Sequence, residues 1–292
     1  MSQPPAPLQQ PPVVRPRQEP DRTQSHGEVD TVLWPETIRL RDRRLGAHRD
    51  LDRRRHYFGV EVTAGWLLPP ASVSWDRHVP IFEQGDCAGA AAFAMVGALG
   101  SAPLLTEDMR QVVVPQKDGP PTTLFDIRAG QYTADLAAAI YAQATHLDQI
   151  GDATAVWPQT DPGTTPDAVC QVVRNMGLIT GWGHCLGASS VPHALQMYGP
   201  LLLSLPWYEG FDEPAPVGAE LRIDGQVRGG NTVLCRRYEH GASPDSSWFW
   251  LDSNWGTSFG IDGQVRLSAS TLRQLYDEGA HAIALKTGNP RA

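Results

Sequence analysis

The 292-residue sequence predicts a protein of the α+β class, because segments with helical patterning come first and β-rich segments follow. Between residues 88 and 177 the apolar residues recur at helical spacing, whereas after residue 199 short apolar runs are punctuated by Gly, Pro and Asp. A composition of 41% hydrophobic and 19% charged residues is typical of a soluble globular protein of this length. We therefore expect two halves that pack on each other.

Two segments precede the helical half. Residues 1–28 are rich in Pro, Gln and Arg, which predicts a disordered tail that is dispensable for folding. Residues 29–82 predict an extended lead-in, because apolar runs such as VTAGWLLPPASVSW alternate with turn residues. The Arg-rich run at 39–56 is interleaved with aspartates, which favours a solvated surface over a polyanion-binding patch.

The helical half spans residues 83–198. Its central element is an Ala-rich helix over residues 90–99, which is apolar on nearly every side and so is expected to be buried. Residues 134–149 have apolar residues on one helical face and polar residues on the other. A third helix is expected after Thr165, a residue suited to the N-cap, with Pro166 in its first turn.

The β-rich half spans residues 199–292. We expect strands in the runs GPLLLSLPWY, GGNTVLCRRYE, SSWFWLDSNW and GQVRLS. Each run is bounded by turn residues, and the sequence contains no internal repeat.

Charge and targeting signals exclude several classes of function. Residues 1–58 hold 11 Lys and Arg against 8 Asp and Glu, a net charge of +3. Because the whole chain has a net charge of −8, the remainder carries −11. An acidic body argues against nucleic acid as the main ligand, since a binding face must neutralise phosphates. No secretory signal is visible in the residues given, and no apolar run is long enough to span a bilayer. We expect no membrane association and a cytoplasmic location, or release by a route that needs no signal.

The four cysteines show neither a CxxC pair nor zinc-finger spacing. In a cytosolic protein we expect all of them to be free thiols. A metal cluster could be built from Cys170, His184, Cys185 and His193, but buried thiols and surface histidines are far commoner. The sequence therefore predicts neither a metal nor a cofactor.

Four separated motifs carry a family resemblance: QGDCAGAAAF (84–93), GPLLLSLPWYEGF (199–211), GGNTVL (229–234) and WFWLDSNWGTSFGIDGQVRLS (248–268). In order and spacing, over roughly residues 40–286, they resemble the papain family of cysteine peptidases, and most of all its bacterial and phage branch. The resemblance implies a two-lobed fold. A helical lobe with a central helix would pack against an antiparallel β-rich lobe, with a substrate groove between them.

Papain-like chemistry requires a thiolate nucleophile, a histidine that activates it and an asparagine that orients the imidazole. The resemblance implies an oxyanion glutamine at Gln84 and places the nucleophile six residues later, where the chain has Ala90. It places the histidine at Asn231, and the orienting asparagine at Ser253. All three catalytic residues are thus replaced. Cys87 falls where many relatives carry a cysteine that forms a structural disulfide.

The leading hypothesis is therefore a catalytically inactive pseudopeptidase that binds a peptide or a protein partner in the groove. The residues expected along this groove are Gln84, Trp207, Gly229, Gly230 and Trp255. Gln84 could instead cap the helix or form a hydrogen bond with the backbone. Trp207 and Trp255 could simply be core aromatics. Asn231 and Ser253 could simply satisfy each other's hydrogen bonds.

Three alternatives stay open from the sequence. An active hydrolase or acyl-transfer enzyme could use Cys87 as a relocated nucleophile. A different chemistry could use Asn231 or Asp252, and Asn254 could take the orienting position if the strand slipped by one residue. The chain could also be a structural module of a larger assembly. The sequence says nothing about the oligomeric state.

Overall fold

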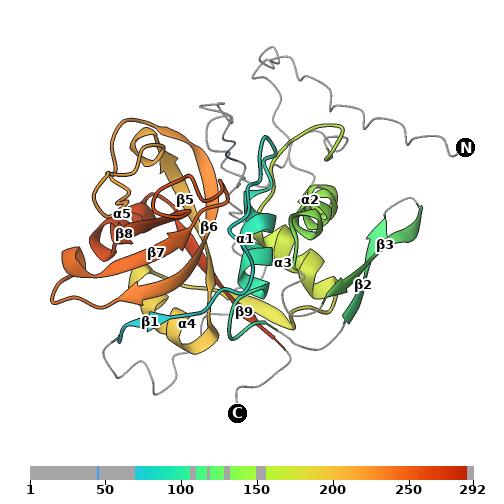
Figure 1. Ribbon diagram of the computed structural model, residues 1–292, viewed down its shortest axis with the longest axis horizontal. Coiled ribbons are helices and arrows are strands. Elements are labelled where there is room, and N and C mark those ends of the chain that lie inside the picture. Colours follow the sequence, from blue (N-terminus) through green and yellow to red (C-terminus); the bar gives the residue numbers. More distant parts are fainter. Residues whose placement is uncertain are drawn as a thin grey trace, which may run out of the picture.

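The computed structural model describes residues 45, 70–105, 110–116, 119–127, 132–148 and 156–287. The predicted disordered tail at 1–28, and all of the predicted lead-in before residue 70 except Leu45, lie outside these residues. A helical lobe and a β-rich lobe lie side by side (Figure 1). Over the ranges described, no helix has the length and apolar character that crossing a bilayer requires.

In the described part of the helical lobe there are three helices, as the sequence predicts: α1 (Ala90–Leu99), α2 (Ala134–Asp148) and α3 (Pro166–Asn175). All ten residues of α1 are buried, which agrees with its apolar surface on every side. Its small residues allow neighbours to approach closely, since a Cβ at Gly97 would lie 3.2 Å from the Leu234 side chain of the sheet.

Local sequence signals account for the start of α3. The Thr165 hydroxyl accepts a hydrogen bond from the Ala168 backbone N–H at 3.1 Å, so this residue is the N-cap that the sequence predicts. Pro166 occupies the first helical position, where its missing N–H has no intrahelical partner to lose. Asp167 follows in the first turn.

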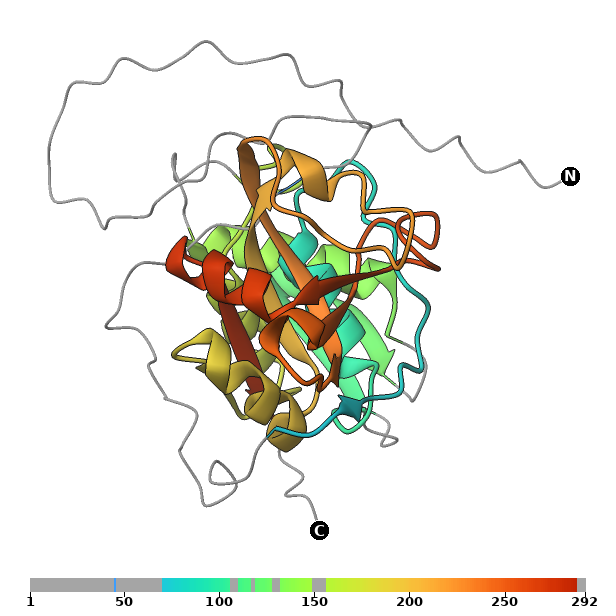
Figure 2. The same cartoon turned by 90° about the vertical axis from the view of Figure 1, so that its left-hand side faces the viewer.

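The β-rich lobe is built on one antiparallel sheet of seven strands in the order β4-β9-β5-β6-β7-β8, with β1 pairing with β6. The strands are β1 (Val73–Ser74), β4 (Gly181–His184), β5 (Leu201–Tyr208), β6 (Val227–Glu239), β7 (Trp248–Asp252), β8 (Gln264–Ser268) and β9 (His281–Lys286). Strands β5, β6, β7 and β8 fall on the four runs predicted from the sequence. A view turned by 90° shows this sheet in front of the helices (Figure 2).

Helices α4 (Val191–Tyr198) and α5 (Ala269–Asp277) belong to the same lobe. Val191 and Leu195 of α4 pack into the core of the β-rich lobe, as does the isolated Leu45, which is fully buried. Strand β4 pairs with β9 at the edge of the sheet. The sequence analysis assigns residues 181–198 to the helical half, but β4 is part of the sheet and α4 packs in the core of the β-rich lobe.

The chain also forms a hairpin that the sequence analysis does not predict. It joins β2 (Arg110–Gln116) to β3 (Gly119–Ile127) as a separate two-stranded antiparallel sheet. The hairpin projects from the helical lobe on the side away from the seven-stranded sheet (Figure 1).

Candidate functional site

The first and fourth sequence motifs meet through their backbones. The Gln84 N–H donates to the Asn254 carbonyl at 2.8 Å, and the Gly256 N–H donates to the Phe82 carbonyl at 2.9 Å. The chain just before α1 is thereby paired with the chain just after β7. Helix α1 packs in turn on β6, which carries the third motif, so the motifs converge where the two lobes meet (Figure 1).

Asn254 links the lobes at this point. Its side-chain Nδ2 donates to the Ala90 carbonyl at 3.1 Å and to the Thr232 carbonyl at 2.7 Å. One buried amide thus joins the first residue of α1 to β6. We call this set, Gln84, Ala90, Thr232 and Asn254, the α1 junction. From the sequence, Asn254 is expected to matter only if the strand slips by one residue and brings it to the orienting position. Its bridging role is not predicted from the sequence.

Ala90 lies at the start of α1, and Gln84 lies in the loop before it. Ala90 is the first residue of the helix and is fully buried, so this position offers only a methyl group. The Gln84 side chain is also buried, and its Nε2 donates to the Cys87 carbonyl at 2.7 Å. This bond to the backbone matches the structural interpretation of the glutamine.

Asn231 lies in β6, opposite Leu205 of β5. Paired residues share one face of a sheet, so the Asn231 side chain lies on the face of β6 that carries Val233 and the core of the β-rich lobe. It is 1% exposed, and its Oδ1 has no hydrogen-bond partner among the residues described. An unsatisfied buried acceptor is uncommon in folded proteins.

Ser253 does not supply that partner. Its hydroxyl is 3.5 Å from the Gly256 carbonyl and accepts from the Trp255 N–H at 3.4 Å. The expectation that Asn231 and Ser253 satisfy each other is therefore wrong. The short turn after β7 directs the serine toward its own backbone instead.

The two tryptophans expected along the groove belong to the core. Trp207 is fully buried and Trp255 is 4% exposed, and their ring centroids are 4.9 Å apart at a steep angle. Phe259 packs on Trp255 at 4.9 Å. Gly229 and Gly230 are buried as well, opposite Trp207 and Pro206 of β5. These residues shape the end of the β-rich lobe and present little surface to a ligand.

Cys87 is a free thiol, 8% exposed, in the loop before α1. A Cβ at Gly89 would lie 3.3 Å from its Sγ and 3.2 Å from the Tyr141 ring, so thiol and ring flank the same glycine. Burial raises the pKa of the Tyr141 hydroxyl, and the neighbouring Asp161 carboxylate raises it further. Tyr141 therefore stays protonated, donates to Asp161 at 2.6 Å, and cannot serve as a base for the thiol.

Asp252, a second candidate for a new chemistry, is fully buried and paired with two arginines. Its Oδ2 lies 3.0 Å from Arg77 Nη1 and 2.8 Å from Arg236 Nε, and its Oδ1 accepts from Gln264 at 2.7 Å. A carboxylate held this way has its charge balanced and its oxygens occupied. We assign it a structural role in joining the lead-in segment to the sheet.

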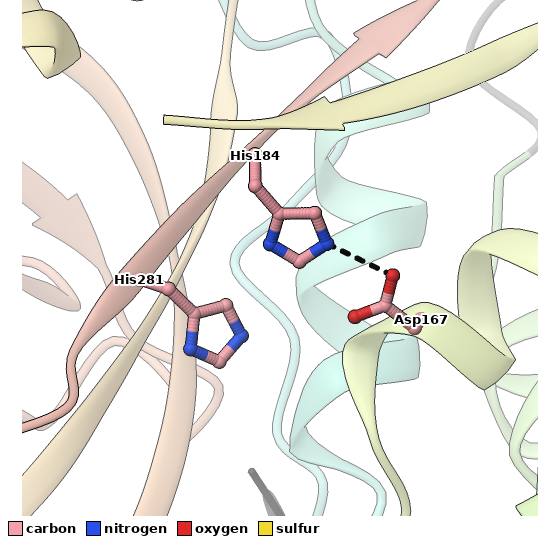
Figure 3. A group of neighbouring side chains, drawn as sticks. All are labelled: Asp167, His184 and His281. Carbon is pink, nitrogen blue, oxygen red and sulfur yellow. Dashed lines mark hydrogen bonds and ion pairs between the residues drawn. The ribbon is translucent and has the colours of Figure 1, made fainter. Parts of the chain in front are cut away.

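A second cluster of polar groups lies between the lobes, and the sequence analysis does not find it. Asp167 of α3 faces His184 of β4 and His281 of β9 (Figure 3). His184 Nε2 is 2.9 Å from Asp167 Oδ1, which also accepts from the Trp182 indole at 2.8 Å. We call Asp167, His184 and His281 the α3 cluster.

The electrostatics of the α3 cluster favour an ionised carboxyl. Burial alone would raise the pKa of Asp167, but the hydrogen bond and positive potential of His184, with the Trp182 hydrogen bond and His281, hold it below its ordinary value. The structure thus groups His184 with Asp167 and His281, and not with the cysteines and His193 considered from the sequence. Of these three residues, the sequence indicates only His184 as a candidate metal ligand, because no local spacing links it to Asp167 or His281.

Neither a family model nor a curated protein matches the sequence. The fold, however, is similar to that of solved structures. Xylellain, a cysteine protease from Xylella fastidiosa, has a TM-score of 0.54 at 15% identity, covering 84% of this chain and 96% of its own.

Two further structures are similar at lower scores. Digestive procathepsin L 3 of Tenebrio molitor larval midgut has a TM-score of 0.49 at 12% identity, covering 79% of this chain and 73% of its own. Procathepsin B S9 from Trypanosoma congolense has a TM-score of 0.47 at 12% identity, covering 84% of this chain and 87% of its own. Together with the two lobes described above, the similarity to xylellain shows that the chain has a papain-like α+β fold.

Proposed function

We propose that this protein is a catalytically inactive papain-like pseudopeptidase that binds a peptide or a partner protein between its lobes. The observation that carries the proposal is the α1 junction. At the start of α1, where the motif resemblance implies a nucleophile, there is a fully buried Ala90 whose carbonyl accepts a hydrogen bond from Asn254. A methyl group can neither attack a carbonyl nor receive a proton.

The histidine position supports the same conclusion. Asn231 lies on β6 and has no group that takes up a proton near neutral pH. Removing a nucleophile or base from a catalytic set of this kind costs on the order of 10⁶ in rate, so losing both is expected to abolish turnover. Two parts of this proposal rest on the motif resemblance: the replacement of all three triad residues, and the assignment of the chain to the bacterial and phage branch of the family.

Asn231 Oδ1 is the feature that favours a bound peptide. A buried acceptor that lacks a partner gains a hydrogen bond when a ligand brings an N–H to it, and peptide backbones offer such donors at regular intervals. Because Asn231 is 1% exposed and lies beside core side chains of the β-rich lobe, a peptide can reach this oxygen only if the side chains that cover it move aside. Micromolar affinity, about −8 kcal/mol, is the expected range.

The first test asks for activity and binding together. A broad peptide library is screened for cleavage by the full chain, and the same library is used to select binders. We expect no cleavage above background and a family of selected peptides that bind intact. Cleavage that iodoacetamide or Cys87→Ser abolishes would overturn the proposal.

The second test uses Asn231→Leu, which is close in volume and lies among apolar side chains such as Val233 and Leu205. We expect the fold to be kept and the affinity for selected peptides to fall at least about tenfold, because the acceptor is gone. Asn175→Leu, at the exposed end of α3, is the matched control. Unchanged affinity in Asn231→Leu would remove the groove as the binding surface and favour a structural module.

Ala90→Trp is a poor blocking variant, since Ala90 is fully buried and a larger side chain would disrupt α1 packing.

An enzyme that uses Cys87 is the second candidate. The observation in its favour is that Cys87, at 8%, is the most exposed of the four cysteines. Labelling of Cys87 by a thiol probe at neutral pH, blocked by a selected peptide, would support this candidate. Labelling that no peptide affects would count against it.

A further inference from the structure

We propose that Asp167, His184 and His281 form a binding site for Zn²⁺ that bridges the two lobes. This inference is independent of the proposed function, because the α3 cluster shares no residue with the α1 junction. The three side chains come from different elements and point toward one another (Figure 3).

The spacing of the donor atoms suits a small cation. One ligand atom from each residue can be chosen so that all three lie within 4.8 Å of one another, and His184 Nε2 is already 2.9 Å from Asp167 Oδ1. Zinc binds imidazole nitrogen and carboxylate oxygen at about 2.0–2.2 Å, so the donors of a tetrahedral site are separated by about 3.3–3.5 Å. Side-chain rotations that change these separations by about 0.5–1.5 Å would bring the three atoms to that spacing.

The chemistry of the donors selects the class of metal. Two imidazoles and one carboxylate make up a three-residue set of the kind that zinc accepts, with its fourth position left to water or another ligand. Mg²⁺ and Ca²⁺ require mostly oxygen donors, and a single carboxylate does not provide them. The cluster should therefore prefer Zn²⁺ to both.

The scaffold holds the donors in place. His184 pairs with Ile283 of β9, and His281 lies two residues before Ile283, so the pleat of the sheet puts both imidazoles on one face. That face carries Ile283 and Leu285 into the core of the helical lobe, where α3 begins. The Trp182 indole, hydrogen-bonded to Asp167, fixes the carboxylate from outside the site, as partners of metal ligands commonly do.

The site is partly covered and can still be reached. The side chains of Asp167 and His184 are 12% and 18% exposed, which leaves a path for an ion while removing most of the competing water. Asp167 belongs to the helical lobe, and both histidines belong to the sheet of the β-rich lobe. A bound ion would thus join the two lobes and stabilise the folded arrangement over the unfolded chain.

The experiment measures Zn²⁺ affinity of the full chain by competition with a chromophoric chelator. We expect saturable binding in the micromolar range or tighter at this site, and no competition from Mg²⁺ or Ca²⁺. His184→Ala and His281→Ala should each weaken binding at least about tenfold. His240→Ala removes an exposed histidine outside the cluster and should leave that affinity unchanged.

A spectroscopic measurement keeps the test decisive if a histidine variant fails to fold. Co²⁺ bound to the unmodified protein should show the intense visible absorption of a four-coordinate site, and Zn²⁺ should displace it. Asp167→Asn, which keeps the shape of the side chain, should weaken binding as well. The proposal is overturned if the protein shows no saturable binding below about 1 mM. Histidine variants that fold and bind as tightly as the unmodified chain would also overturn it, as would a weak six-coordinate Co²⁺ spectrum.

Discussion

The α1 junction and the α3 cluster, both formed by polar groups where the lobes meet, differ in what those groups can do. At the α1 junction, Asn254 donates to two backbone carbonyls, and the position where the motif resemblance implies a nucleophile holds Ala90. At the α3 cluster, a carboxylate and two imidazoles face one another and lie partly exposed. The first set of contacts closes an interface, whereas the second presents donors that a ligand could use.

This difference teaches that a fold does not fix where chemistry is possible. The motif resemblance directs attention to the start of α1, where Ala90 and Asn254 are 0% and 4% exposed. A carboxylate and two imidazoles lie elsewhere along the same interface, at the α3 cluster.

Asp252→Ala should have the largest effect, because it leaves Arg77 and Arg236 without their shared carboxylate beside the α1 junction. Breaking a buried ion pair from one side costs about 3–5 kcal/mol. The free energy of unfolding, measured with urea, should fall by about that amount. Asp245→Ala, in an exposed turn, is the control and should change little. A fall of less than about 1 kcal/mol in the free energy of unfolding would mean that the ion pairs of Asp252 contribute no more than exposed ion pairs do.

Asn254→Ala should come next. It removes hydrogen bonds to the Ala90 and Thr232 carbonyls and leaves both without that donor, which costs about 1–3 kcal/mol. Urea unfolding measures the loss, and Asn175→Ala on the exposed end of α3 is the matched control. If the two variants were equally stable, Asn254 would not be the link between the lobes.

His281→Ala without added metal should cost less than Asn254→Ala. His281 is partly exposed, and substitutions at such positions usually change stability by about 1 kcal/mol or less. Urea unfolding in a chelator buffer would show this order. The reverse order would mean that the α3 cluster holds the lobes together by itself and that the contrast between the two junctions is wrong.

Cysteine alkylation should show the smallest effect, a change in reactivity with no change in the fold. Burial raises the pKa of the Cys185 thiol to about 12 and raises the pKa values of Cys170 and Cys235 as well. These thiols therefore stay protonated and unreactive at pH 8. We expect iodoacetamide to modify only Cys87 in the folded protein and all four cysteines in urea, as read by mass spectrometry.

The same shifts give a pH dependence. A thiol whose pKa is higher in the folded state contributes stability below its unfolded pKa, about 8.5, and that contribution is lost as the pH rises toward 12. The free energy of unfolding should therefore fall above about pH 9. Modification of Cys170 or Cys235 at pH 8 in the folded protein would contradict the burial of the two cores.

Local patterns in the sequence determined the elements whose signals are themselves local. The apolar run gives α1 its bounds of residues 90–99, and Thr165 with Pro166 gives α3 its start, because propensity and capping act within a few residues. The four β-rich runs became β5 to β8 for the same reason. The order of the motifs was enough to predict the papain-like fold.

Only the tertiary structure decided which distant residues meet. No spacing in the sequence brings Asp167 to His281, or the Asn254 amide to the Ala90 carbonyl, because each pair joins elements that become neighbours through packing. The structure likewise placed β4 and α4 in the β-rich lobe and buried Trp207 in its core. Periodicity tells which face of an element is apolar, but the partner of that face, and so the position of each polar group, depends on how the whole chain packs.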